Sequence, residues 1–151
     1  MASTSLTGKD TIQIDNRVLN DLADGDAVKL TFPDDIAKAK ASKNGNVIYA
    51  FNNMGLLVEA EVRVLLGSSD DKYLNSRMQE QINDISSMIL ITGNFSKRVG
   101  DGQGNISSVI YQMSGGVIKK QPEAKTSAEG DVEQSVAVYI ITFGQNQRSI
   151  Q

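Results

Sequence analysis

The clearest strand pattern in the chain is LLVEAEVRVLL, residues 56–66, in which apolar and charged side chains alternate. Successive side chains of a β-strand point to opposite faces of its sheet, so this alternation predicts a strand with one face in the core and one in water. The predicted core face consists of Val58, Ala60, Val62 and Val64. The predicted solvent face, called here the wet face, consists of Glu59, Glu61 and Arg63.

The periodicity changes directly after this strand. Gly67 is followed by Ser68, whose hydroxyl is suited to cap a helix, and then by Asp70 and Asp71, whose charges favour the positive end of a helix dipole. Apolar residues then recur at helical spacing, at Leu74, Met78, Ile82 and Ile85. The sequence therefore predicts one amphipathic helix over about 70–86, with this stripe packed against the rest of the fold.

Upstream of residue 56, short strand signals are separated by turns. Residues 11–14 and 17–19 flank the pair Asp15-Asn16, and these two residues tolerate the left-handed conformations that tight hairpins use. Residues 47–51 are a further strand signal. Residues 28–32 alternate, with Val28, Leu30 and Phe32 on one face and Lys29 and Thr31 on the other. The side of this strand that carries Lys29 and Thr31 is a second predicted solvent face.

Downstream of the helix the chain returns to strand character over residues 89–96, 109–113, 117–118 and 132–143. The Gly-rich residues 100–105 precede a strand and lack the spacing of a phosphate loop, so they predict a hairpin turn. Ser114, Gly115 and Gly116 predict a bulge or a close approach of backbones. The last strand is apolar on both faces, which predicts burial on both sides. Taken together, these strand, turn and helix signals predict a mainly β chain, an antiparallel β-sandwich or barrel with one flanking α-helix.

Length and composition limit the classes of function. The 151 residues correspond to a single domain, 1–151. The formal net charge of -3 argues against a basic surface that grips nucleic acid. The chain contains neither Cys nor His, which excludes disulfides, thiolate nucleophiles, imidazole zinc sites and Ser-His dyads. We therefore expect a protein that is not an enzyme, with no catalytic, cofactor-binding or metal-binding residues.

Two features admit a different interpretation. Acidic residues cluster at 21–26, 34–35 and 70–71, and carboxylates can coordinate a hard cation, but turn formation and helix capping explain these clusters without a metal. Glu59 and Glu61 point the same way on one strand and offer a carboxylate pair. Arg63 continues their row, which favours a solvated face or a contact between subunits.

The chain shows no targeting or membrane pattern, and three of its segments are predicted to be exposed or flexible. The first residues lack a basic segment followed by an apolar core, and the longest apolar run, 88–91, is too short for a membrane helix, so we expect synthesis in the cytoplasm and no membrane partner. Small and charged residues dominate 33–46, which we expect to be an exposed loop or hairpin. We also expect a flexible N-terminal arm and a flexible C-terminal tail over 145–151.

Short stretches spread over nearly the whole chain carry a family resemblance: LTGKDT at 6–11, VLNDLADGD at 18–26, LTFP at 30–33, KNGN at 43–46, SDDKYLN at 69–75, TGNF at 92–95, KRVGDG at 97–102 and EGDVEQ at 129–134. They resemble the tail tube, or inner tube, proteins of contractile-tailed bacteriophages. These stretches are architectural signatures and include no catalytic motif.

The resemblance implies a virion structural protein located in the phage tail and assembled in the host cytoplasm. It implies homohexameric rings that stack into a helical tube, through which the tape-measure protein and double-stranded DNA pass during ejection without specific binding. The other implied partners are the tail sheath, baseplate and tail terminator proteins. The acidic net charge is suited to an acidic channel lining that repels phosphate.

Within such a tube two sets of residues are candidates for function. The candidates for the lumen are Glu59, Glu61, Arg63, Lys29 and Thr31, although alternation identifies only a wet face and leaves open whether it faces the channel or the sheath. The candidates for contacts between rings are Lys38, Lys40, Lys43, Asn44, Lys9 and Arg148, because flexible polar segments can order on a neighbouring ring.

Two other functions stay open at this point. A tube protein of a related contractile injection system, such as a bacteriocin or a type VI secretion apparatus, would have the same sequence features. A monomeric ligand-binding β-sandwich would display aromatic residues on its loops, whereas most of the four Tyr and four Phe here lie in strand patterns.

Overall fold

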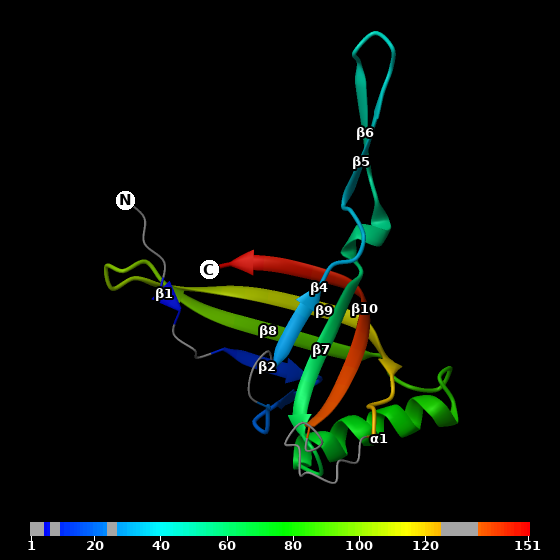
Figure 1. The fold of residues 1–151 in the computed structure, drawn as a ribbon, viewed down its shortest axis with the longest axis vertical. Coiled ribbons are helices and arrows are strands. Elements are labelled where there is room, and N and C mark those ends of the chain that lie inside the picture. The colour runs from blue at the N-terminus through cyan, green and yellow to red at the C-terminus, as the bar shows by residue number, and fades with distance from the viewer. Residues whose placement is uncertain (1–4, 7–9, 24–26, 125–135) are drawn as a thin grey trace.

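The computed structural model describes residues 5–6, 10–23, 27–124 and 136–151, and Figure 1 draws its fold. In chain order the strands are β1 (Ser5–Leu6), β2 (Thr11–Ile14), β3 (Arg17–Val18), β4 (Val28–Thr31), β5 (Ala37–Ala41), β6 (Val47–Phe51), β7 (Val58–Leu65), β8 (Ile91–Gly100), β9 (Ile106–Lys120) and β10 (Val136–Ile150). The helices are the 3-10 helix η1 (Asn53–Leu56) and the α-helix α1 (Ser69–Asn83). The prediction of a mainly β chain with one flanking α-helix is confirmed.

One antiparallel sheet contains every described strand except β5 and β6, which pair with each other. Its order is β3-β2-β8-β9-β10-β7-β4, and β1 pairs with β8. The order begins at β3 and ends at β4, so over the described residues the sheet is open. The barrel alternative is therefore wrong for the single chain, because closure requires the two outer strands to pair.

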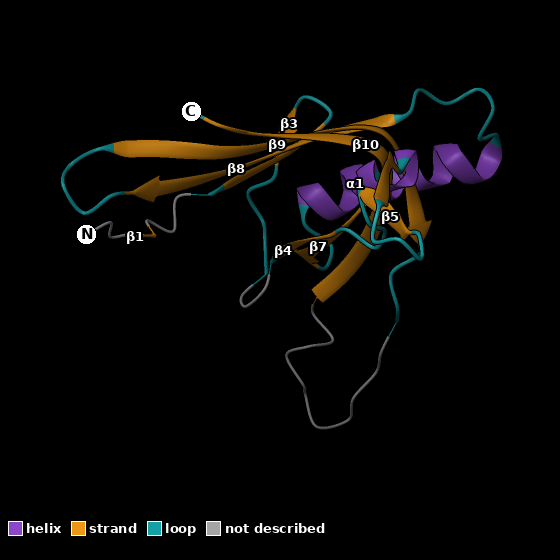
Figure 2. Cartoon of the chain, turned by 90° about the horizontal axis from the view of Figure 1, so that it is seen from above, coloured by secondary structure: helices purple, strands orange, loops and turns teal. Residues whose placement is uncertain are grey.

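The long strand β10 joins the two halves of the sheet. Its first half, Val136 to Phe143, pairs with β7, and its second half continues beside β9 as far as Ile150, which lies opposite Val109. Figure 2 shows β8 and β9 in one layer and β4 and β7 in another, with β10 bending between them. The expectation of a flexible tail over 145–151 is wrong, because strand pairing holds this segment; of the predicted last strand, residues 132–135 lie outside the described residues.

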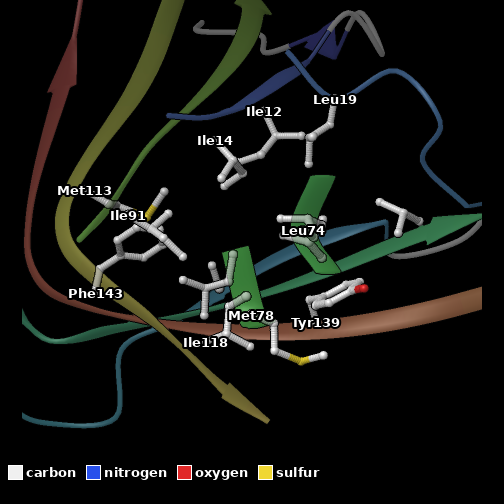
Figure 3. Close-up of a cluster of buried hydrophobic side chains, with 14 of the residues drawn as sticks. Ile12, Ile14, Leu19, Leu74, Met78, Ile91, Met113, Ile118, Tyr139 and Phe143 are labelled. Atoms are coloured by element: carbon white, nitrogen blue, oxygen red, sulfur yellow. The ribbon is translucent and has the colours of Figure 1, made fainter. Parts of the chain in front are cut away.

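A single hydrophobic core lies between these layers and α1 (Figure 3). The predicted core face of β7 is buried at all four positions, and β10 buries Ala137, Tyr139, Ile141 and Phe143 against it. The opposite face of β10 is half-buried at Val138 and Ile140. The expectation that both faces of this strand are buried holds fully for one face only.

The helix begins where its cap predicts and ends earlier than its apolar stripe predicts. The Ser68 hydroxyl accepts a hydrogen bond from the Asp71 amide, and Leu74 and Met78 are buried. Ile82 and Ile85, which we expected in the core, are 62% and 55% exposed. The C-terminal end of α1 extends beyond the sheet (Figure 2). The last two residues of the apolar stripe, Ile82 and Ile85, therefore have no sheet surface to pack against.

The predicted turns and the bulge are present. Asp15 adopts the left-handed conformation, with φ 55°, in the β2–β3 turn, and residues 101–105 connect β8 to β9. The register between β8 and β9 shifts between Ile91 and Gly93, opposite Gly115 and its neighbours. A Cβ on Gly116 would lie 2.6 Å from the Phe143 ring and 2.8 Å from the Ile91 carbonyl oxygen, so this glycine permits both the bulge and a close approach.

The 33–46 segment is mostly ordered as part of a hairpin, which was the second of the two expectations for it. The strands β5 and β6 form a two-stranded sheet that projects from the body (Figure 1). The Asn52 amide group and backbone amide donate to the carbonyl oxygens of Asp35 and Ile36, at 2.8 and 2.9 Å. A Cβ on Gly55 would lie 2.5 Å from the Asp35 carbonyl oxygen. The base of the hairpin is therefore packed tightly against η1.

Candidate functional site

The wet face predicted for residues 58–65 extends across three strands. In the β4–β7 register, Lys29 lies opposite Glu61 and Thr31 lies opposite Glu59, and in the β7–β10 register Arg63 lies opposite Val138. Directly paired residues of antiparallel strands share a face of the sheet. All five candidate lumen residues are therefore brought together on one face of β4 and β7.

The charges on this wet face are mixed. The Lys119 ammonium forms an ion pair with the Glu59 carboxylate, and Lys120 lies opposite Ile140, in the same cross-strand row as Glu61 and Lys29. The two acidic side chains are thus accompanied by basic side chains from β4, β7 and β9. The expected acidic lining is not what this face presents, because β9 contributes lysines that the alternation in a single strand does not reveal.

An ionic clamp between the β2–β3 hairpin and the start of α1 was not predicted from the sequence. The Asp70 side chain is 1% exposed and accepts hydrogen bonds from the Arg17 Nε at 3.0 Å and from the backbone amides of Asn20 and Asp21 at 2.7 and 2.8 Å. Burial raises the pKa of Asp70, but these hydrogen bonds outweigh burial and hold its pKa below the ordinary value of 3.8. The sequence assigned this residue only to helix capping.

A half-buried tyrosine, Tyr73, and a buried one, Tyr139, add to this clamp. The Tyr73 hydroxyl donates to Asp15 at 2.6 Å, and the Tyr139 hydroxyl donates to Asp71 at 2.6 Å. Burial, together with the hydrogen bond to Asp15, raises the pKa of Tyr73 to about 12, and burial and Asp71 raise the pKa of Tyr139 further. Both acids that look like generic turn or capping residues therefore fix the helix to the sheet.

The β5–β6 hairpin has one entirely apolar face. Its register pairs Ala37 with Phe51, Ala39 with Tyr49 and Ala41 with Val47, whereas the other face carries Lys38, Lys40, Ile48 and Ala50. Every residue of both strands is exposed, with Tyr49 at 75% and Phe51 at 65%. The alternation Ala-Lys-Ala-Lys-Ala in the sequence is consistent with this face, but alanine side chains are too small to predict an apolar surface by themselves.

The candidates for contacts between rings are spread over three places. Lys38 and Lys40 lie on β5, and Lys43 and Asn44 lie in the turn between β5 and β6, all exposed. Arg148 lies on β10, where its Nε donates to the Tyr111 hydroxyl at 3.0 Å and its guanidinium stacks over the same ring. Lys9 lies outside the described residues.

In the part of the chain that the structure describes, no group of three or more Asp and Glu side chains is arranged to hold a metal ion. A cavity of about 340 Å³ between α1 and β10 contains Asp71 and Tyr139, which are engaged with each other. No helix among the described residues is long and apolar enough to span a lipid bilayer.

The fold is similar to that of solved chains from a contractile injection system. The chain is similar to a chain of the sheath–tube complex of an extracellular contractile injection system, PVC, in its extended state, with a TM-score of 0.54 and 11% identity, over 94% of this chain and 87% of the other. It is also similar to a chain of the sheath/tube terminator of the same system, with a TM-score of 0.50 and 10% identity, over 95% and 94%. No protein-family model and no curated protein matches the sequence.

Proposed function

We propose that this chain is a structural tube subunit, whose copies form hexameric rings that stack into the inner tube of a contractile tail. The observation that carries the proposal is the exposed apolar face of the β5–β6 hairpin. A two-stranded hairpin is marginally stable alone, and exposed apolar patches on soluble proteins mark interaction sites. Assembly with further copies covers this face.

The likeness in fold supports a tube-type role, because the similar chains belong to sheath–tube and terminator assemblies of a contractile injection system. The sequence resemblance to phage tail tube proteins directs the proposal to a virion tail, in which the tube conducts the tape-measure protein and double-stranded DNA. The fold comparison favours a second candidate, the tube of a related injection apparatus. Sheath, baseplate and terminator proteins are the proposed partners in either case.

The wet face of β4, β7 and β10 is the proposed channel surface. Its charged side chains are partly neutralised by one another, as in the pair Lys119–Glu59 and the row Lys29–Glu61. A surface of balanced charges gives DNA neither a basic track to bind nor a uniform repulsion. The proposed transport is therefore passive, and the proposal includes no catalytic role.

Electron microscopy and light scattering of the purified protein test this function. At high protein concentration, negative staining is expected to show hollow tubes or six-fold rings, and multi-angle light scattering is expected to show a mass that rises with concentration. A strictly monomeric protein at all concentrations contradicts the proposal. Rings that recruit a sheath protein from a phage gene cluster distinguish the phage tail from the injection apparatus.

A further inference from the structure

A second apolar surface lies at the C-terminal end of α1. It consists of Ile82, Ile85, Ile89 and Leu90, which are 62%, 55%, 81% and 45% exposed, and is called here the helix-end patch. Single exposed apolar residues are common, but four within nine positions form a cluster that the fold leaves uncovered. This patch and the hairpin face are distinct surfaces, since they come from different parts of the chain.

The helix-end patch is held in a fixed shape. The Gln81 side-chain amide exchanges two hydrogen bonds of 2.9 Å with the backbone of Ile118, which anchors the last turn of α1 to β9. The Asp84 carboxylate accepts from the Ser86 amide at 3.0 Å and from its hydroxyl at 2.6 Å, and Arg77 donates to the Ile89 carbonyl oxygen. The patch is therefore presented by a hydrogen-bonded turn.

The hairpin and the patch have opposite charges around their apolar groups. Residues 36–51 carry Lys38, Lys40 and Lys43 and no acidic residue, whereas residues 78–91 carry Glu80 and Asp84 and no basic residue, Glu80 being paired at 3.0 Å with the neighbouring Arg77. The carbonyl end of α1 adds the negative end of the helix dipole. Of the other exposed apolar residues, Ile106 lies on β9, which pairs with the part of β8 that carries Lys97 and Arg98, and Ile150 lies on β10 near Arg148. These basic side chains would repel the hairpin lysines.

A single chain cannot bring these two surfaces together. Figure 1 shows the hairpin at one end of the longest axis and α1 at the other. The contacts of Asn52 and Gly55 at the hairpin base oppose a fold-back onto the body. The partner that presents an acidic apolar patch of this kind to the hairpin is therefore a second copy of the same chain.

We propose that the apolar face of the β5–β6 hairpin of one copy docks on the helix-end patch of another copy. The contact is heterologous, because it joins two different surfaces, and it repeats from copy to copy without ending at a dimer. It buries Tyr49 and Phe51 against Ile82, Ile85 and Ile89, while Lys38 and Lys40 on the opposite hairpin face stay in water and attract the acidic helix end at longer range. This inference rests on the proposed tube function and names the two surfaces that join its subunits.

Cysteine cross-linking tests the docking directly, because the natural chain contains no cysteine. The test variant combines Ala39→Cys, on the apolar face of the hairpin, with Asn83→Cys, at the border of the patch. Both positions are exposed, and neither substitution removes a large apolar side chain of the two surfaces. The matched control combines Ala50→Cys, on the lysine face of the same hairpin, with Asn83→Cys.

Oxidation under assembly conditions is expected to convert the test variant into a ladder of covalent oligomers on a non-reducing gel. A chain with both partners of a head-to-tail contact extends in both directions, whereas each single-cysteine variant gives at most dimers. The control is expected to give no ladder. A mixture of a tagged Ala39→Cys chain and an untagged Asn83→Cys chain is expected to give a mixed dimer.

The outcomes separate the docking from the proposed function. Tubes or rings of the test variant that form without a ladder overturn the docking and leave the tube function standing. A ladder of equal yield in the Ala50→Cys control also overturns the docking, because cross-linking would then not depend on the apolar face of the hairpin. A protein that forms no assembly overturns both proposals.

Discussion

At the residue scale, the most informative side chains are carboxylates that look unremarkable in the sequence. Asp15 and Asp70 lie more than fifty positions apart, yet both hold α1 to the β2–β3 hairpin: Asp70 through Arg17, and Asp15 through Tyr73 and Arg77. The ordinary function of such residues in turns and caps gives no hint of a long-range partner. Their contribution follows from burial of the charged groups together with their donors.

Replacement of Asp70 by alanine is expected to lower the free energy of unfolding by about 2–3 kcal/mol, because it leaves two backbone amides and the Arg17 guanidinium without their acceptor. The difference in urea midpoint between wild type and D70A measures this loss. Asp35→Ala, at an exposed position, serves as the control and is expected to change stability by less than about 0.5 kcal/mol. Equal midpoints for D70A and the wild type contradict the clamp.

The tyrosine–carboxylate pairs predict a loss of stability in alkali. A pKa of about 12 for Tyr73, raised from 10.0, means that the folded state favours the neutral phenol. The resulting stabilisation is fully present below pH 10 and is lost as the pH rises toward 12. Tyr73→Phe is expected to flatten the decline of the urea midpoint over this range, whereas Tyr49→Phe, at a 75% exposed position, leaves it steep. An equally steep decline of the urea midpoint with pH in Y73F and wild type would refute the coupling between Tyr73 ionisation and stability.

At the element scale, the helix and the long strands show that local periodicity predicts an element but not which of its residues are buried. The apolar stripe that begins in α1 is regular over about three turns, but only its first two residues, Leu74 and Met78, are buried against the sheet. The strand β10 crosses from β7 to β9 because its backbone continues to pair after its apolar alternation has ended. Periodicity therefore identifies an element, while the extent of the surface opposite it decides which residues are buried.

Two substitutions in the same stripe distinguish the buried from the exposed half of α1. Leu74→Ala is expected to lower the free energy of unfolding by about 3 kcal/mol, because it leaves a cavity in the core. Ile82→Ala, at a 62% exposed position, is expected to change it by less than about 1 kcal/mol. Chemical denaturation of both variants below the concentration of assembly measures the contrast. Comparable losses would place Ile82 in the core after all.

The bulge in β9 gives a second contrast between matched substitutions. Gly116→Ala is expected to destabilise the fold by about 2 kcal/mol, because the new methyl group meets the Phe143 ring and the Ile91 carbonyl. Gly144→Ala, where the nearest atom would be 3.8 Å away, is expected to be nearly neutral. Thermal unfolding measures the stability of both variants. A G116A protein as stable as the G144A protein would show that the bulge accommodates the methyl group without loss of stability.

At the scale of the whole molecule, the chain is a folded body with surfaces that it does not cover itself. The body contains one core, whereas the hairpin and the helix-end patch leave large apolar side chains in water. The length of 151 residues suffices for an independent domain, so this exposure does not result from a chain that is too short. In the proposed assembly, neighbouring copies of the chain cover these side chains.

A double substitution on the hairpin separates folding from assembly. Tyr49→Lys combined with Phe51→Lys is expected to leave the melting temperature of the monomer unchanged within about 4 °C, because the hairpin lies outside the core. The same variant is expected to form neither rings nor tubes under the electron microscope. Ala50→Ser, on the opposite face, is the control and keeps its assemblies. Tubes of the Y49K/F51K protein would contradict the proposed role of the apolar face.

Local sequence pattern predicted a strand over 56–66, observed over 58–65, with its two faces, together with the Ser68 cap, the turn at Asp15 and the bulge near Gly116. Each of these depends on neighbours within a few positions. The sequence pattern also placed Lys29 and Thr31 on a solvent face, which the register then joined to that of Glu59 and Glu61. Long-range packing determines three other features: the sheet is open over the described residues, 145–150 continues β10, and Ile82 and Ile85 are exposed to water. These outcomes depend on which surfaces meet at long range, and no local periodicity contains that information.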